Sequence, residues 1–192
     1  MARLRGFERL TGVDEALSTL LKELRLERLA SVRVPLHEAL GRVLAEDAVA
    51  ESDLPPFDRS AVDGYALRAK DTFEASQVSP KVLKLTKEDR IDEREARQIW
   101  TGNPLPRGAD AVVMLEHTKR VQGGIQVWNS VTPGHNISRR GEDVERGEVA
   151  VKEGTRLRPH HLGLLAALGR MHVSVVEKPV VAILSTGSEL VE

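Results

Sequence analysis

Residues Leu54 to Arg68 read L-P-P-F-D-R-S-A-V-D-G-Y-A-L-R. The paired prolines fix the backbone and predict an edge or a loop rather than the interior of a strand. The Asp63-Gly64 step predicts a tight turn that presents its carboxylate outward. A purely structural role explains the prolines and the glycine. It explains less well why Asp58, Ser60 and Asp63 lie so close together in one turn. This stretch is therefore the first candidate site.

Three other stretches place polar groups in turns. Thr101 to Thr118 reads T-G-N-P-L-P-R-G-A-D-A-V-V-M-L-E-H-T, Arg139 to Glu148 reads R-R-G-E-D-V-E-R-G-E, and Ser185 to Leu190 reads S-T-G-S-E-L. A hydroxyl with free backbone N–H groups, as at Thr101, suits an oxyanion. Each stretch also has a purely structural reading: a turn between strands, an exposed charged turn with local pairing, and a helix start capped by Ser188.

Composition excludes several classes of protein. The chain has 192 residues, 41% of them hydrophobic and 30% charged, which is typical of a globular protein of one large or two small domains. A formal net charge of -1 and only 3% aromatic residues give no support for nucleic-acid binding. The absence of cysteine excludes disulfides and thiolate metal sites. No apolar run approaches the roughly 20 residues of a membrane helix, so we expect a cytoplasmic protein that contacts no membrane.

The expected fold is α+β and mostly β, with a discontinuous α/β first domain that carries an inserted small antiparallel β domain. Residues 1–52 and 134–178 form the first domain, for linkage or dimerisation, and 53–133 form the insert. Helical spacing predicts helices over Val13–Arg28, Leu36–Leu44 and Pro159–Leu168. Alternating or apolar stretches predict strands at Val32–Val34, Glu46–Ser52, Val82–Thr86, Ala111–Leu115, Gly124–Trp128 and Met171–Val176, while Glu93–Ile99 stays undecided between a helical turn and a strand.

The apolar run Pro179 to Leu184 is typical of a strand buried in a parallel sheet. Loops that follow such strands build ligand sites in open α/β folds, which draws attention to Ser185–Ser188. No β-α-β partner for this strand lies upstream. We therefore expect residues 179–192 to begin a truncated α/β domain, and the chain to be an N-terminal fragment.

The four polar stretches, in this order, resemble the molybdopterin molybdenumtransferase (molybdenum insertase) family, which includes the E domain of gephyrin. The resemblance covers most of the chain from Val34 onward. It implies insertion of molybdate or tungstate into adenylylated molybdopterin with release of AMP, with Mg2+ or another divalent cation taking part. It also implies a homodimer, a pterin-binding continuation of the truncated domain, and a molybdopterin adenylyltransferase as donor of the substrate.

The resemblance assigns roles to particular residues. Those it implies as catalytic are Asp63, Thr101 and Glu189, with Asp63 and Glu189 also as metal ligands. Those it implies as substrate-binding are Ser185, Thr186, Gly187, Asp143, Arg139 and Arg140. Three departures from the family pattern are Asn103, where many relatives carry a small residue, Ser138, where relatives often carry a third arginine, and Ser188, where they carry Asp. The alternative is a non-catalytic dimerisation or partner-binding module derived from the same family.

Overall fold

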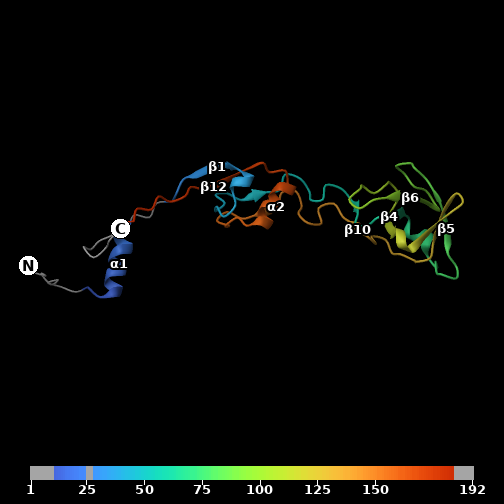
Figure 1. The fold of residues 1–192 in the computed structure, drawn as a ribbon, viewed down its shortest axis with the longest axis horizontal. Coiled ribbons are helices and arrows are strands. Elements are labelled where there is room, and N and C mark those ends of the chain that lie inside the picture. Colours follow the sequence, from blue (N-terminus) through green and yellow to red (C-terminus); the bar gives the residue numbers. More distant parts are fainter. Residues whose placement is uncertain (1–10, 25–27, 184–192) are drawn as a thin grey trace, which may run out of the picture.

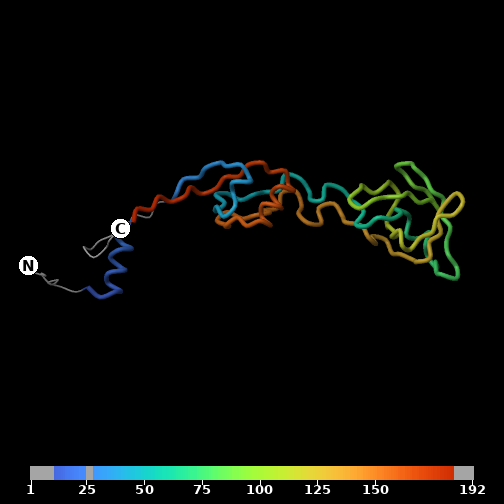
Figure 2. Tube along the Cα trace, viewed as in Figure 1, coloured from blue at the N-terminus to red at the C-terminus, as the bar shows by residue number. Residues whose placement is uncertain are grey.

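The computed structural model describes residues 11–24 and 28–183, and Figures 1 and 2 show two folded units set apart along an elongated molecule. The chain crosses between the units twice. The outgoing segment and the returning segment are hydrogen-bonded to each other, because the Leu54 N–H donates to Val144 O at 2.8 Å and the Ala50 N–H donates to Glu148 O at 2.8 Å. One unit is therefore discontinuous in sequence, and the other is inserted into it.

The discontinuous unit contains two short antiparallel strand pairs. Strand β1 (Ser31–Pro35) pairs with β12 (His172–Val176), and β2 (Ala48–Val49) pairs with β11 (Val149–Val151). Helix α2 (Pro159–Ala167) covers them, and its Leu165 lies in the same core as Leu44 and Val175. Pro159 begins α2, as the sequence predicts, and the helix ends at Ala167, one residue before the predicted end; Gly169, at φ 78°, follows it.

The inserted unit is a curled sheet of six strands in the order β7-β4-β6-β5-β9-β8. All neighbouring strands are antiparallel except β5 and β6, which confirms the predicted, mostly antiparallel β insert. The strands are β4 (Gly64–Leu67), β5 (Lys81–Leu85), β6 (Glu95–Ile99), β7 (Ala111–Met114), β8 (Thr118–Val121) and β9 (Gly124–Val127).

Side chains hold this sheet in its curled form. Arg120 of β8 donates to the Tyr65 hydroxyl of β4 at 3.3 Å and to Gln98 Oε1 of β6 at 2.7 Å, and so joins strands that are not neighbours. Thr72, in the 3₁₀ turn η2 (Ala69–Thr72), is fully buried; its hydroxyl donates to Ala69 O and accepts the Val131 N–H. The hydrophobic core of the inserted unit includes Tyr65, Leu67 and Ile125.

Helix α1 (Val13–Glu23) stands outside both units, and none of its residues is buried. It ends at Glu23, where the sequence predicts a helix to Arg28; Leu24 already has an extended backbone, and residues 25–27 lie outside the described chain. Gly12 is its N-cap residue. The leucines that the periodicity places on one face, Leu17, Leu20 and Leu24, are all exposed.

Two further predictions differ from the structure, and one alternative that the sequence leaves open is resolved. The predicted helix Leu36–Leu44 is only the 3₁₀ turn η1 (Leu36–Glu38), because Gly41 has φ 75° and the Leu44 N–H donates to Thr155 O instead of to a helical carbonyl. The undecided segment 93–99 becomes strand β6 from Glu95 onward. Residues 179–183 form no strand, and Val180, Val181 and Ile183 are exposed; Leu184 lies outside the described residues.

The boundaries between the units stay a prediction, although the structure adds detail near residue 134. The Gly134 N–H donates to Asp110 O at 2.6 Å, and the Val112 N–H donates to His135 O at 3.0 Å. Residues 134–138, which the sequence places in the first domain, therefore lie against the inserted sheet. Among the described residues, no helix is long and apolar enough to cross a membrane.

Candidate functional site

Three of the polar stretches meet at the two-residue strand β3 (Arg59–Ser60), which has a partner on each side. On one side it pairs with β10 (Ile137–Ser138). On the other side the Gly102 N–H donates to Ser60 O at 2.8 Å, and the Leu105 N–H donates to Asp58 O at 3.0 Å. The backbone therefore brings together segments around residues 58–63, 101–105 and 137–143 that are far apart in sequence.

Asp63 and Thr101 form the most specific contact of this junction. The Thr101 hydroxyl donates to Asp63 Oδ1 at 2.6 Å, and the Thr101 N–H donates to the same oxygen at 2.8 Å. The hydroxyl first, and then the backbone N–H, hold the pKa of the Asp63 carboxyl below its ordinary value. Asp63 is exposed and ionised at neutral pH, and its Oδ2 accepts no hydrogen bond from a described residue.

The glycine after Asp63 has a different role from the predicted one. Gly64 is not the second residue of a tight turn but the first residue of β4, between β6 and β7. A Cβ at this position would lie 2.0 Å from the carbonyl oxygen of Val113. Glycine is required here because two strand backbones approach closely. The Asp63 carbonyl accepts the Leu115 N–H at 3.1 Å, so β4 and β7 together fix the position of Asp63.

Arg139 and Arg140 are paired with carboxylates of the outgoing segment. Asp58 accepts the Arg140 N–H at 2.8 Å and lies 3.5 Å from Arg139 Nη1. The Arg140 side chain pairs with Asp53, which also accepts the Arg146 N–H at 2.8 Å. That backbone hydrogen bond first, and then the Arg140 side chain, lower the pKa of Asp53.

Asp53 was missed at the sequence level. Its position, five residues before Asp58 and just ahead of the prolines, is the only signal that marks it. Asp143 is exposed, and its N–H donates to Leu54 O at 2.9 Å, while its carboxylate has no partner among the described residues. Ser60 is buried; its hydroxyl donates to Val62 O at 2.5 Å and so supports the loop that ends at Asp63.

The other candidate residues lie outside the described residues. These are Ser185, Thr186, Gly187 and Glu189. Residues 11–24 and 28–183 contain no group of three or more His, Cys, Asp or Glu that could hold a metal ion. Asp63 offers one carboxylate oxygen, which is a single ligand and not a complete metal site.

The pair His160-His161 has a structural role in α2. Adjacent residues of a helix ordinarily point in different directions, but the two rings contact edge to face with centroids 4.1 Å apart. The reason is local: His161 turns back so that its Nδ1 accepts the Arg158 N–H at 3.1 Å and caps the helix. Desolvation first, and then the charge of the neighbouring His160, lower the pKa of His161.

The fold is a two-domain module. A discontinuous β-rich unit carries a curled six-stranded sheet, and an ionised carboxylate is fixed just before the interior strand β4 of that sheet. Residues 11–169 match the family model described as the MoeA N-terminal region (domain I and II). The chain belongs to this family.

Relatives of this chain are named for molybdopterin chemistry. It is 45% identical over 158 residues to a Methanocaldococcus jannaschii protein named for molybdopterin biosynthesis, and 43% identical over 169 residues to the molybdopterin molybdenumtransferase of Bacillus subtilis. Both matches cover 82% of this chain and 39% of the relative. The crystal structure of the molybdopterin biosynthesis MoeA protein from Pyrococcus horikoshii is similar with a TM-score of 0.79 and 45% identity, over 89% of this chain and 47% of that one. The chain thus spans less than half the length of these proteins.

Proposed function

We propose that this chain is the N-terminal part of a molybdopterin molybdenumtransferase. The activity is insertion of molybdate, or tungstate, into adenylylated molybdopterin with release of AMP, in molybdenum cofactor biosynthesis in the cytoplasm. Family membership and the relatives named for this activity support the proposal. The single observation that carries it is the Asp63–Thr101 pair at the junction of the polar stretches.

The pair suits chemistry at an anionic substrate in a particular way. An isolated carboxylate would repel both molybdate and the adenylyl phosphate, since all three are negatively charged. Both Thr101 donors bind Oδ1, so Oδ2 keeps its capacity to accept a hydrogen bond or a cation. In this proposal Asp63 positions a water molecule or a cation ligand, and Thr101 holds the carboxylate in one orientation.

The remaining parts of the proposal concern groups beyond this pair. A divalent cation such as Mg2+, when bound, would neutralise charge between the carboxylate and the anions, with Asp63 and Glu189 each supplying one oxygen. Ser185, Thr186 and Gly187 are proposed to bind substrate. Arg139 and Arg140 are proposed to do so, Arg139 by exchanging its carboxylate partner for the anion; the Arg139–Asp58 pair is exposed on both sides, and such ion pairs are weak.

Asp143 is proposed as a further substrate contact, since its exposed carboxylate has no partner within residues 28–183. A homodimer and a molybdopterin adenylyltransferase as donor complete the proposed assembly. The alternative, a non-catalytic dimerisation or partner-binding module, is favoured by one observation: helix α1 exposes its apolar residues instead of burying them against the described parts of this chain.

A chimeric enzyme tests the function directly. Residues 11–169 of this chain replace the matching region of the Bacillus subtilis transferase, and release of AMP from adenylylated molybdopterin is measured with molybdate and Mg2+ present. We expect molybdate-dependent AMP release and formation of the molybdenum cofactor. A folded chimera with the oligomeric state of the parent enzyme and no AMP release would reject the proposal in favour of the assembly module.

A further inference from the structure

Two different carboxylates hold Arg140, one at its backbone and one at its side chain. The Arg140 N–H donates to Asp58 Oδ1 at 2.8 Å, and the Arg140 Nε donates to Asp53 Oδ2. Within residues 11–24 and 28–183, no group accepts a hydrogen bond from Nη1 or Nη2 of this side chain, which is 66% exposed. An anchored guanidinium thus keeps both of its terminal nitrogens free of any described partner.

Asp53 is a fixed anchor for that guanidinium. Its side chain is only 14% exposed, and its second oxygen, Oδ1, accepts the Arg146 N–H at 2.8 Å. Because each carboxylate oxygen has its own partner, the carboxylate cannot turn without breaking one of the two hydrogen bonds. The Arg146 N–H first, and then the Arg140 side chain, hold the pKa of Asp53 below its ordinary value, so the anchor is ionised at neutral pH.

The backbone on both sides of this contact is hydrogen-bonded as well. The Leu54 N–H donates to Val144 O at 2.8 Å, and the Val144 N–H donates back to Leu54 O at 3.1 Å. Gly141, next to Arg140, has φ 72° and lies so close to Asp53 that an added Cβ would be 3.8 Å from Asp53 Cγ. The loop that carries Arg140 is therefore supported by the segment that carries Asp53.

Arg139 provides a first comparison, because its ion pair lacks these features. Its Nη1 lies 3.5 Å from Asp58 Oδ2, and the two side chains are 61% and 42% exposed. Such a pair is weak and exchanges readily. Asp53 is mostly covered instead, and separating it from Arg140 would leave a largely buried charge with a single hydrogen bond, which is costly. An incoming anion is therefore expected to displace Asp58 from Arg139 but to leave Asp53 on Arg140.

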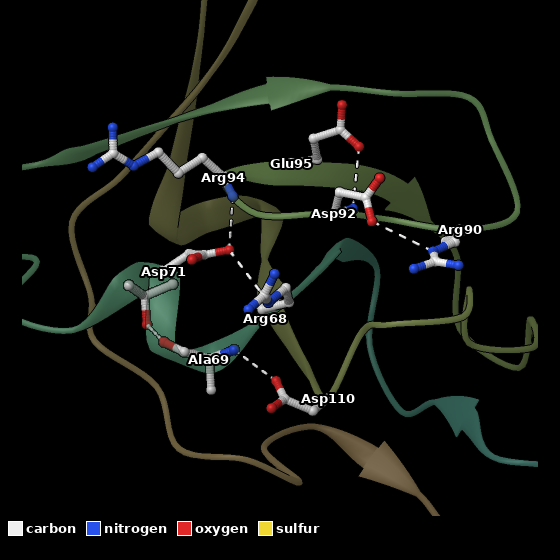
Figure 3. Close-up of polar contacts among 9 residues, drawn as sticks. Arg68, Ala69, Asp71, Arg90, Asp92, Arg94, Glu95 and Asp110 are labelled. Atoms are coloured by element: carbon white, nitrogen blue, oxygen red, sulfur yellow. Dashed lines mark hydrogen bonds and ion pairs between the residues drawn. The ribbon is translucent and has the colours of Figure 1, made fainter.

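Asp71, in the turn η2, provides a second comparison (Figure 3). Its Oδ2 accepts the Arg94 N–H at 2.9 Å and lies 3.9 Å from Arg68 Nε. Asp71 thus holds one backbone N–H and one guanidinium, as Asp53 does, and its side chain is 6% exposed. Its arginine differs, because the Arg68 side chain is only 23% exposed and lies outside the segments that meet at β3. Of these two anchors, only Asp53 holds an exposed guanidinium beside the candidate site.

We propose that Asp53 is a positioning residue of the candidate site: it holds Arg140 by Nε, so that Nη1 and Nη2 together bind two oxygens of one oxyanion. A guanidinium fork matches two oxygens of a phosphate group or of a tetrahedral oxyanion such as molybdate, through paired hydrogen bonds. An arginine that is already held has less rotamer freedom to lose on binding than a mobile one, so it binds the anion more tightly. The inference rests on the proposed function in one respect, the role of Arg140 in substrate binding.

The test is NMR of the 192-residue chain labelled at its arginine nitrogens and titrated separately with molybdate and with inorganic phosphate. We expect the Arg140 Nε–H signal to be protected from exchange with water, and the Arg140 signals to shift as the anion is added. Asp53→Asn can keep an oxygen on the Arg146 N–H, but it presents an amide donor to Arg140 Nε, so the protection is lost and anion binding weakens roughly two- to tenfold. Asp71→Asn is the matched control, because it removes the same kind of anchor from Arg68, and it leaves the anion affinity unchanged. Binding of either anion supports the inference, and the tighter of the two identifies the oxyanion that the fork takes.

Steady-state kinetics of the chimera give a second readout that a purely structural role would not move. Asp53→Asn raises the KM of the substrate that carries the oxyanion, with kcat nearly unchanged. In an Arg140→Ala background, Asp53→Asn has no further effect on KM, because the side chain that it positions is gone. If Asp53→Asn fails to fold, Arg140→Lys replaces it as the test: an ammonium held by Asp53 has no fork left, so lysine binds the anion less tightly than arginine does.

Four results would overturn the inference: an Arg140 Nε–H that exchanges freely in the parent, no shift of the Arg140 signals with either anion at millimolar concentration, equal anion affinity in Asp53→Asn and the parent, or equal loss in Asp71→Asn. An Arg140→Lys variant that binds the anion as the parent does would also contradict it. The chimera separates the two proposals. An inactive parent chimera with anion binding at Arg140 intact rejects only the transferase function, whereas an active chimera whose KM is indifferent to Asp53→Asn rejects only the role of Asp53.

Discussion

Replacing Gly64 by alanine tests whether the close approach of β4 and β7 positions Asp63. The new Cβ would lie 2.0 Å from Val113 O and 2.9 Å from Val113 C, against ordinary contacts of 3.4 Å and more. Both atoms are backbone, so no side-chain rotation relieves the overlap. The strands must separate by more than an ångström, which strains the ladder and the Leu115 N–H to Asp63 O hydrogen bond of 3.1 Å.

We expect Gly64→Ala to destabilise the inserted unit by about 3 kcal/mol, the upper range for overpacking. For a unit of this size that corresponds to a fall in Tm of roughly 15 °C. Urea denaturation measures the free energy of unfolding; tryptophan fluorescence follows the insert, which contains Trp100 and Trp128, and circular dichroism follows both units. Gly124→Ala is a matched case, because its Cβ would lie 2.2 Å from Leu83 O, and it should cost a similar amount.

The control is Gly163→Ala in α2, where a Cβ meets nothing within 4 Å. Alanine is the better helix former, so this change should stabilise its own unit by about 0.8–1 kcal/mol. If Gly64→Ala unfolds within 0.5 kcal/mol of the parent while the control behaves as expected, the close approach does not fix β4, and the reasoning that places Asp63 is wrong.

Three further predictions concern the site and the assembly. Thr101→Val raises the pKa of Asp63 towards its ordinary value, as NMR titration of the carboxyl group would show. Because the pKa of Asp63 is lower in the folded parent than in the unfolded chain, its ionised form stabilises the fold above the unfolded pKa, and this stabilisation is lost as the pH falls through the folded pKa. The variant therefore loses less stability on acidification than the parent does, which unfolding measurements at each pH would show. The 192-residue chain alone releases no AMP from adenylylated molybdopterin, because it is proposed to supply only part of the active site; robust turnover would contradict this. Sedimentation at micromolar concentration finds a homodimer that Leu20→Glu weakens and Glu23→Gln does not; a monomeric parent would refute the role of α1.

The sequence predicts much of this architecture because its signals are local. Pro159 and Gly169 delimit α2, and alternating residues mark β5, β7 and β9. The Asp-Gly step was assigned wrongly, since a glycine required by a neighbouring strand has the same local signature as one required by a turn. The short strands β3 and β10 have too few residues to show alternation.

In the candidate site, too, the sequence predicts local features but not contacts between distant segments. Asp63 and Thr101 are 38 residues apart in sequence. The sequence places each of them in a polar stretch, but it does not predict the hydrogen bond between their side chains. The sequence does not identify Asp53 as a site residue. Its partners, Arg140 and Arg146, come close to it only because the returning segment runs beside the outgoing segment in the folded chain.

The most direct test of the central claim is AMP release by the chimera carrying either Asp63→Asn or Asp58→Asn. Both changes remove one charge and preserve side-chain shape, and Asp58 is held by Arg139 and Arg140 rather than by Thr101. We predict that Asp63→Asn lowers the rate by about a hundredfold, as for loss of one preorganised electrostatic group. Asp58→Asn should lower it far less, with both variants melting close to the parent. Equal rates for Asp63→Asn and the parent, with the protein folded, would remove Asp63 from the reaction and contradict the account.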